Sequence, residues 1–251
     1  MKKCIAMILV VLSLFLLTSC DQEHVVMQEY KTYEISTGIN SLNISINAAD
    51  FSIKTSDKIS VKSNLKYLSV FEKDGELLVV DEAKHTANYN GAVLELCIPN
   101  GVVFERVKIN TGAAKMTVDS LSANTFDLDL GAGKVKFNNL KAYSKINIDG
   151  GAGEVIIDNG MFKNLTMNLG VGKSSVRAVL LGESELKFGV GESNLTVVGK
   201  GEDYKLDIQK GVGSITLDGV LVSSSVVNGF GQHCIKIQGG VGAVNVKFQE
   251  N

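Results

Sequence analysis

One short segment of the chain has the residue types of a phosphate-binding loop. Residues 170–174 read Gly-Val-Gly-Lys-Ser, the end of a motif in which backbone amides, a lysine and a hydroxyl surround nucleotide phosphates. The complete motif needs a glycine five residues before Gly172, but Met167 stands there. It also needs a helix after the lysine, whereas the residues that follow alternate as in a strand. We therefore expect no nucleotide site here.

Other glycine-rich segments also lack residues that ligand binding requires. Gly189-Val190-Gly191 fails as a dinucleotide fingerprint because Asn194 takes the place of the third glycine. Segments 150–153 and 239–242 are similar to calcium-binding nonapeptide rolls, but valines at positions 155 and 244 replace the required aspartates. The sequence therefore predicts no cofactor and no metal in these segments.

The remaining candidate ligands and nucleophiles are dispersed. Four aspartates on the polar phase of predicted strands could bind a cation loosely, although a solvated face is the favoured interpretation: Asp127, Asp129, Asp149 and Asp207. The three histidines lie in separate segments, and none is next to a nucleophile: His24, His85 and His233. Cys97 and Cys234 could be free or bridged, with free thiols slightly favoured. We therefore predict no catalytic residues and no enzyme, with a carbohydrate-active enzyme as a less favoured alternative.

The first twenty residues predict export and acylation. Lys2 and Lys3 precede an apolar run of signal-peptide length, which is too short for a comfortable membrane span. The run ends in Leu17-Thr18-Ser19-Cys20, which resembles the bacterial lipoprotein signal. That resemblance implies cleavage before Cys20 and a lipid on its thiol, and two or more acyl chains anchor a protein stably. An ordinary signal peptide with an incidental cysteine is the alternative.

A glycine–apolar–glycine triplet recurs through the second half of the chain. Counted from a degenerate copy at Gly112-Ala113-Ala114, the steps between first glycines are 19, 20, 19, 19, 22 and 29 residues. We interpret the glycines as structural corners that bend the chain and let neighbouring coils approach closely, with the central Ala or Val pointing inward. The complete triplets begin and end at Gly131 and Gly133, Gly151 and Gly153, Gly170 and Gly172, Gly189 and Gly191, Gly211 and Gly213, and Gly240 and Gly242.

Apolar residues alternate with polar ones on both sides of each triplet, which is the period of a strand with one buried face. Together with the repeat, this pattern predicts an all-β fold, a β-solenoid similar to a parallel β-helix, with rungs of about 20 residues. Seven rungs about 4.8 Å apart would form a rod roughly 30 Å long. A sandwich of hairpins is the alternative, but it would not explain the regular triplet. The residue after each triplet would form a partly alternating Lys/Glu column.

Four regions are expected along the chain. They are a lipoprotein signal peptide (1–19), a polar tether (20–31), irregular N-terminal β coils (32–106) and the repeat β-solenoid (107–251). The long last step contains a loop of small residues from Leu221 to Gly231, which is interpreted as a looser final coil rather than a functional excursion.

The chain resembles the toast-rack putative-adhesin family of bacterial cell-envelope proteins over nearly all of residues 32–251. The resemblance is carried by Leu96 to Gly101, then Phe104, then Val107 to Ala113, the later triplets and the early segment from Leu42 to Ile53. It implies a β-solenoid at the cell surface, with adhesion proposed for the family, and it provides no catalytic residues. Ala114 departs from the pattern because it replaces the second glycine of the first triplet.

These features predict an exported, lipid-anchored, non-catalytic protein of the bacterial membrane or cell surface that acts as an adhesin or an assembly scaffold. Its expected partners are the membrane, through lipidated Cys20, and a surface protein or glycan. The alternative is an accessory protein of envelope-stress sensing that docks on a membrane signalling partner. The net charge of −2 and the lack of a basic block argue against nucleic-acid binding. The absence of Trp disfavours a lectin-like site.

Overall fold

The computed structural model describes residues 24–83, 87–223 and 225–250. Within them the chain is built from strands and one short 3₁₀ helix, η1 (Gly201–Asp203). The all-β prediction is therefore confirmed. None of the described residues belongs to a helix that is long and apolar enough to cross a bilayer. Cys20, His85 and the expected signal peptide lie outside the described residues.

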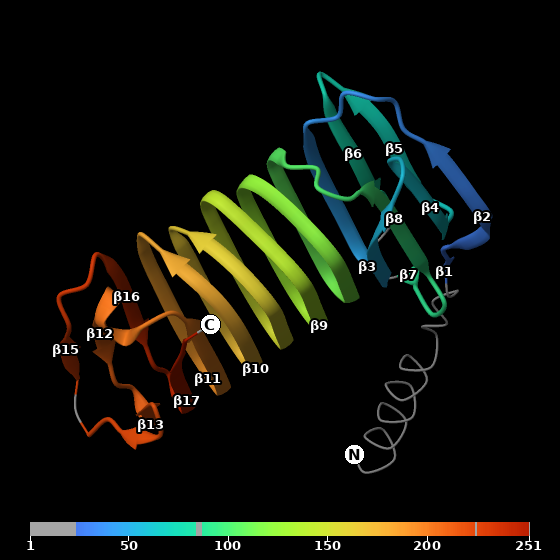
Figure 1. Cartoon of the computed structure of the whole chain (residues 1–251). Helices are drawn as coiled ribbons and strands as arrows, with labels where there is room; N and C mark the ends of the chain where they lie inside the picture. Colours follow the sequence, from blue (N-terminus) through green and yellow to red (C-terminus); the bar gives the residue numbers. More distant parts are fainter. Residues whose placement is uncertain (1–23, 84–86, 224, 251) are drawn as a thin grey trace, which may run out of the picture.

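The central part of the fold is a series of stacked coils, each carrying one triplet. Three long strands form it: β9 (Phe104–Lys163), β10 (Leu165–Leu181) and β11 (Glu183–Val198). β10 pairs in parallel with β9 on one side and with β11 on the other, so that Gly172 lies in register with Gly153 and Gly191. Figure 1 shows these coils following one another along the long axis of the molecule.

Alternation explains why these residues form strands with one buried face. In the coil around Gly151, Ile146 and Ile148 precede the triplet while Val155 and Ile157 follow it, and all four are buried. The residues between them, Asn147 and Ile156, face outward and are only partly buried. Burying each such side chain is favourable by about 1.5–3 kcal/mol, and stacking neighbours joins these short apolar sets into one continuous core.

The last coil of the chain is not the last coil of the stack. β16 (His233–Gln238) and β17 (Val241–Gln249) pair in parallel with β11 on one side. On the other side they pair with β12 (Tyr204–Gln209) and β13 (Val212–Leu217). The repeat predicted stacking in chain order, and that expectation is wrong at this end. Residues 199–203 lead from β11 to the outermost coil, residues 218–232 lead from that coil back to the inserted one, and Asn245 links the inserted coil to both neighbours.

Asn245 bridges the coils on both sides of it. Its side-chain Oδ1 accepts a hydrogen bond of 2.8 Å from Thr216 Oγ1, and its Nδ2 donates one of 2.9 Å to Asn194 Oδ1. An amide can donate in one direction and accept in the other, which suits a central position.

The loop from Leu221 to Gly231 covers the outer edge of the final coil instead of forming a looser coil of its own. It contains part of β14 (Val220–Leu221) and all of β15 (Val226–Asn228). β14 pairs antiparallel with β13, and β15 pairs antiparallel with β12. Such pairing covers strand edges that would otherwise be open to other chains.

The other end of the stack repeats this arrangement. β3 (Ser41–Ser56) comes early in the chain, but it lies between β9 and a coil made of β6 (Glu76–Asp81) and β8 (Val93–Pro99). Antiparallel strands complete this end, and a separate two-stranded sheet pairs β1 with β7. The bounds of these strands are β1 (His24–Val25), β2 (Met27–Glu34), β4 (Ser60–Leu65), β5 (Leu68–Lys73) and β7 (Ala87–Asn88).

Candidate functional site

The second glycines of the triplets form a column in which side chains have no room. Their φ angles are positive, from +131° at Gly133 to +147° at Gly213, a range that L side chains rarely adopt. A Cβ on Gly172 or Gly191 would lie 1.8 Å from the carbonyl oxygen of the glycine one coil away. Glycine is therefore required for both conformation and close approach.

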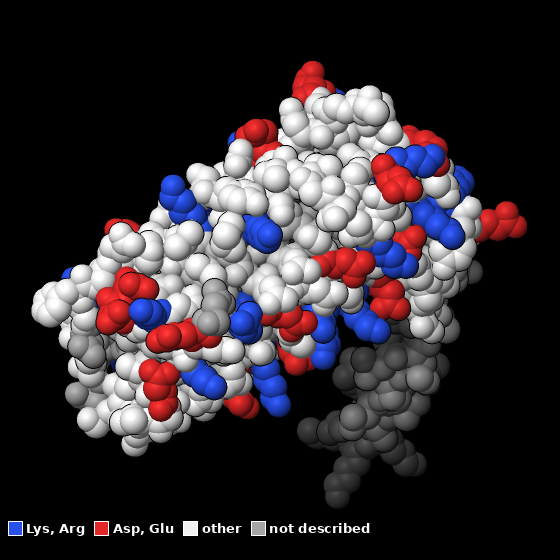
Figure 2. Space-filling view, viewed as in Figure 1, with Lys and Arg blue, Asp and Glu red and all other residues white. Residues whose placement is uncertain are grey.

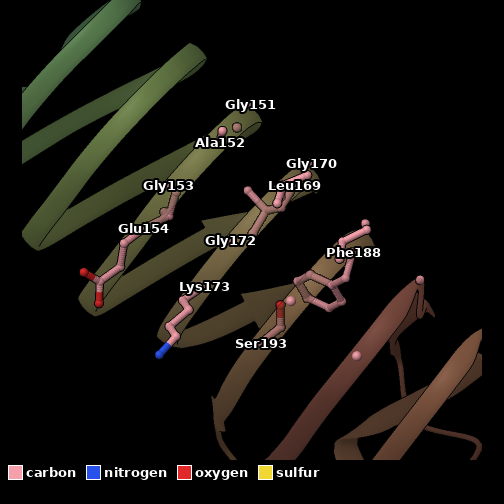
Figure 3. A pocket seen from close by; sticks show the side chains of 18 of the residues that line it. Gly151, Ala152, Gly153, Glu154, Leu169, Gly170, Gly172, Lys173, Phe188 and Ser193 are labelled. Carbon is pink, nitrogen blue, oxygen red and sulfur yellow. The ribbon is translucent and has the colours of Figure 1, made fainter.

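A narrow groove follows the triplets along the stack (Figure 3). Only about 40 Å³ of it has room for water-sized molecules, and its walls come from coils between Thr111 and Val244. Most of its lining is glycine and apolar side chains, among them Leu169 and Phe188, and its polar members are Thr111, Glu154, Lys173, Ser193 and Ser214. The groove offers shape and apolar surface but few groups that could orient a polar ligand.

The central residue of each triplet points outward, which corrects the inward orientation predicted from the sequence. Val171, Val190, Val212 and Val241 keep between 50% and 74% of their surface exposed. The positive φ of the following glycine places the central side chain on the outer phase of the next strand. Because neighbouring coils are in register, these side chains form a line, which we call the triplet row. Its order in space is Ala48, Ala113, Ala132, Ala152, Val171, Val190, Val241 and Val212.

The triplet row borders a polar face. We call it the post-triplet face, and it comprises the triplet row and the residues three, five and seven positions after each first glycine. Lys134 Nζ lies 2.7 Å from Glu154 Oε2, and Lys136 Nζ lies 2.9 Å from Asp158 Oδ2. These pairs join neighbouring coils and are largely exposed, so each contributes at most about 1 kcal/mol. Figure 3 shows Glu154 and Lys173 directed away from the triplet corner.

The charged column next to the triplet row has a different order from that of the sequence. Ala243 lies between Glu192 and Ser214, because the last coil of the chain is inserted. Figure 2 shows acidic and basic side chains interspersed on the side in view, without a large patch of one sign.

Two of the aspartates on the face before the triplets accept hydrogen bonds from asparagines of neighbouring coils. Asn147 Nδ2 donates to Asp127 Oδ1 at 2.7 Å, and Asn168 Nδ2 donates to Asp149 Oδ1 at 2.7 Å. Among the described residues, no group of three or more His, Cys, Asp or Glu side chains is arranged to hold a metal. Asp207 lies in the outermost coil at the C-terminal end, apart from these two pairs.

Residues 170–174 lie within β10, and no helix follows them. Lys173 is exposed, whereas Ser174 is buried with its Oγ lacking a hydrogen-bond partner. The lysine and the hydroxyl therefore point to opposite sides of the strand. This geometry does not suit a phosphate, in agreement with the sequence-based expectation.

Cys97 and Cys234 are both free, as the favoured interpretation had it. His233 Nδ1 accepts a 3.0 Å hydrogen bond from the backbone amide of Gly182, which ties β16 to the neighbouring coil. The ring of His233 also lies against that of Tyr204, with centroids 5.7 Å apart. The roles these contacts support are structural.

A partly buried polar cluster near the N-terminal end was not found from the sequence. Tyr89 donates from its hydroxyl to Asp81 Oδ2 at 2.7 Å, and Asn47 Nδ2 donates to the Tyr89 hydroxyl at 3.0 Å. Burial, together with the hydrogen bond to Asp81, raises the pKa of Tyr89 to about 12. The cluster is internally satisfied and ties β3 to β6, so we assign it a structural role. Its members are far apart in the chain, and no spacing rule marks them.

The fold and the site together define a class of protein: an elongated all-β stack with polar outer faces, an apolar row and no visible catalytic constellation among the described residues. Residues 39–224 match the family model Toastrack DUF4097. The chain belongs to this family. No curated protein matches the sequence.

One solved structure of those compared shares the fold at low sequence identity, and others resemble it more distantly. A putative adhesin from Bacteroides fragilis is 13% identical with a TM-score of 0.53, over 86% of this chain and 95% of that one. A putative cell adhesion protein from Clostridium sporogenes is 14% identical with a TM-score of 0.38, over 88% and 99% of the two chains. A putative adhesin from Parabacteroides merdae is 12% identical with a TM-score of 0.37, over 89% and 99%.

Proposed function

We propose that this protein is a non-catalytic adhesin or assembly scaffold, held by a lipid at the surface of a bacterial cell. In this proposal the stacked coils act as a rigid β-solenoid whose side contacts a partner. The observation that supports it most is the post-triplet face. There, an exposed apolar row lies beside charged columns along the whole stack.

The proposed anchor is Cys20. It follows an apolar run and precedes β1 by only a few residues, so a lipid on its thiol would keep the N-terminal end of the stack close to the membrane. The C-terminal end, with β12 to β15, would then be the distal end.

Two measurements on cells that produce the full chain test this proposal. Protease added to intact cells should remove the protein if it faces outward, and Cys20→Ser should move it from the membrane fraction to the soluble fraction. Cells with the full chain should bind other cells, matrix or envelope material more strongly than cells with Cys20→Ser. An outward-facing, anchored protein that leaves binding unchanged would refute the adhesin function but not the anchor.

A further inference from the structure

We propose that the post-triplet face binds a second copy of this chain in an antiparallel, two-fold arrangement, with the axis passing between the coils of Ala152 and Val171. Three columns of side chains support this assignment: the triplet row and the columns three and seven residues after each first glycine. The proposal concerns an interaction surface and does not depend on the lipid anchor.

The triplet row is divided by size at the proposed axis. On one side of it every member is alanine, and on the other side every member is valine. An antiparallel two-fold axis at the division places each alanine opposite a valine of the second copy. Ala152 faces Val171, Ala132 faces Val190, Ala113 faces Val241 and Ala48 faces Val212. Alternating large and small side chains is how facing layers interdigitate without voids.

Charged side chains next to the triplet row also form pairs of opposite charge about the same two-fold axis. In the column three residues after each first glycine, Glu154 faces Lys173 of the second copy, and Lys134 faces Glu192. Lys115 faces Ala243, which is neutral. Glu154 already pairs with Lys134 of its own chain, and a carboxylate can accept from both lysines.

The column seven residues after each first glycine gives the same result independently. Asp119 faces Lys247, with Asn138 opposite Thr196. Nearest the axis Asp158 faces Arg177, where a bulge between Val176 and Ala178 interrupts the register with β9 and Arg177 Nη1 donates to Asn159 Oδ1 at 3.2 Å. No like charges meet in any of these columns, and interfaces favour such complementarity because like charges in contact are costly.

Other symmetric arrangements bring like charges together. An antiparallel axis through the coil of Val171 places Lys173 opposite itself, and one through the coil of Ala152 places Glu154 opposite itself. A parallel arrangement of two copies places Lys134 opposite Lys136. An axis between the coils of Val171 and Val190 also avoids like charges, but it gives fewer pairs of opposite charge and places Val171 opposite Val190. The number of opposite-charge pairs and the division of the triplet row into alanines and valines together favour the axis between Ala152 and Val171.

The dimensions suit a stable dimer. Eight coils about 4.8 Å apart span roughly 34 Å, and the four outward columns, about 7 Å apart, span roughly 20 Å. The face thus offers roughly 700 Å² per copy, close to the ~800 Å² per partner of a standard specific interface. An antiparallel pair has its N-terminal ends at opposite ends. If the proposed function holds, such a pair would join copies anchored in two facing membranes.

Disulfide trapping tests the orientation and the register. Full-length chains in which Cys4, Cys20, Cys97 and Cys234 are serine would carry either Ala152→Cys or Val171→Cys, and be purified in detergent. We expect a disulfide-linked dimer when the two chains are mixed and oxidised, and little when either is oxidised alone. Lys163→Cys, on an exposed position outside the face, is the control partner. The proposal would be overturned if the Lys163→Cys partner gave the same yield of disulfide-linked dimer. It would also be overturned if either chain oxidised alone gave the same yield as the mixture.

A charge exchange tests the contacts themselves. Lys247→Glu should weaken dimerisation about tenfold in sedimentation experiments, because two symmetric attractive contacts become repulsive and each is worth up to about 1 kcal/mol. Asp119→Lys alone should weaken it similarly, and the double exchange should restore it. Lys163→Glu should change nothing. A chain that is monomeric throughout would refute this surface and leave the adhesin function standing. A chain that dimerises while the cells carrying it do not adhere would support this surface and refute the adhesin function.

Discussion

Gly172 lies directly against Gly153 of the neighbouring coil, so closely that a Cβ on Gly172 would be 1.8 Å from the Gly153 carbonyl oxygen. The same relation recurs along the column, from Gly153 against Gly133 to Gly242 against Gly191. The spacing between coils at the triplets is therefore that of two backbones in contact.

Gly172→Ala should destabilise the protein strongly, because it adds a backbone clash to an unfavourable φ of +145°. Gly219 is a matched control, since its φ is +80° and nothing lies within 4 Å of the position of its Cβ. We expect Gly219→Ala to cost about 1–2 kcal/mol and Gly172→Ala at least twice as much. Urea unfolding measures both, and equal costs would show that close approach is unimportant.

Ser174→Ala should stabilise the protein. The Ser174 side chain is buried and its Oγ has no hydrogen-bond partner, so the hydroxyl is desolvated without compensation. Removing it should raise the free energy of unfolding by about 1 kcal/mol. Ser175→Ala on the exposed side of the same strand should have little effect. A lower melting temperature for Ser174→Ala than for Ser175→Ala would contradict the assignment.

Tyr89→Phe should reduce the loss of stability at alkaline pH. The pKa of Tyr89 is raised to about 12 in the folded state, above its ordinary value of 10. Between these values the unfolded chain releases the proton first, so stability falls as pH rises through this window. Unfolding measured from pH 8 to 12 should show a shallower fall for Tyr89→Phe. Tyr143→Phe, on an exposed side chain, should keep the original slope.

Asn245→Ala should lower the free energy of unfolding by about 1–2 kcal/mol, because two hydrogen bonds across neighbouring coils are lost. Urea unfolding measures this difference.

Removing residues 232–251 should destabilise this end more, since it takes away the coil between β11 and the coil of β12 and β13. We expect fast amide exchange throughout residues 204–231 and retained protection in β9. Protection that persists in residues 204–217 would mean that they can stack on β11 directly.

The register between the central coils could be predicted from the triplets, because the triplet glycines of one coil lie directly against those of the neighbouring coil and can align in only one way. The orientation of Val171 and its equivalents did not follow, since it depends on the φ of the next residue. The order of the last coils could not be predicted either. The triplets at Gly189, Gly211 and Gly240 are interchangeable, and side chains such as Asn245 select the arrangement. The cluster of Asn47, Asp81 and Tyr89 depends on contacts between distant segments.

The inserted position of β16 and β17 has a consequence for biosynthesis. Because a chain emerges from the ribosome with its N-terminus first, residues 204–217 are available before their permanent neighbour exists. Residues 204–217 must therefore stay unpaired on this side, or pair temporarily with β11 until β16 and β17 displace them. This end of the stack can therefore be completed only after residues 233–249 have been synthesised and have inserted between β11 and the coil of β12 and β13.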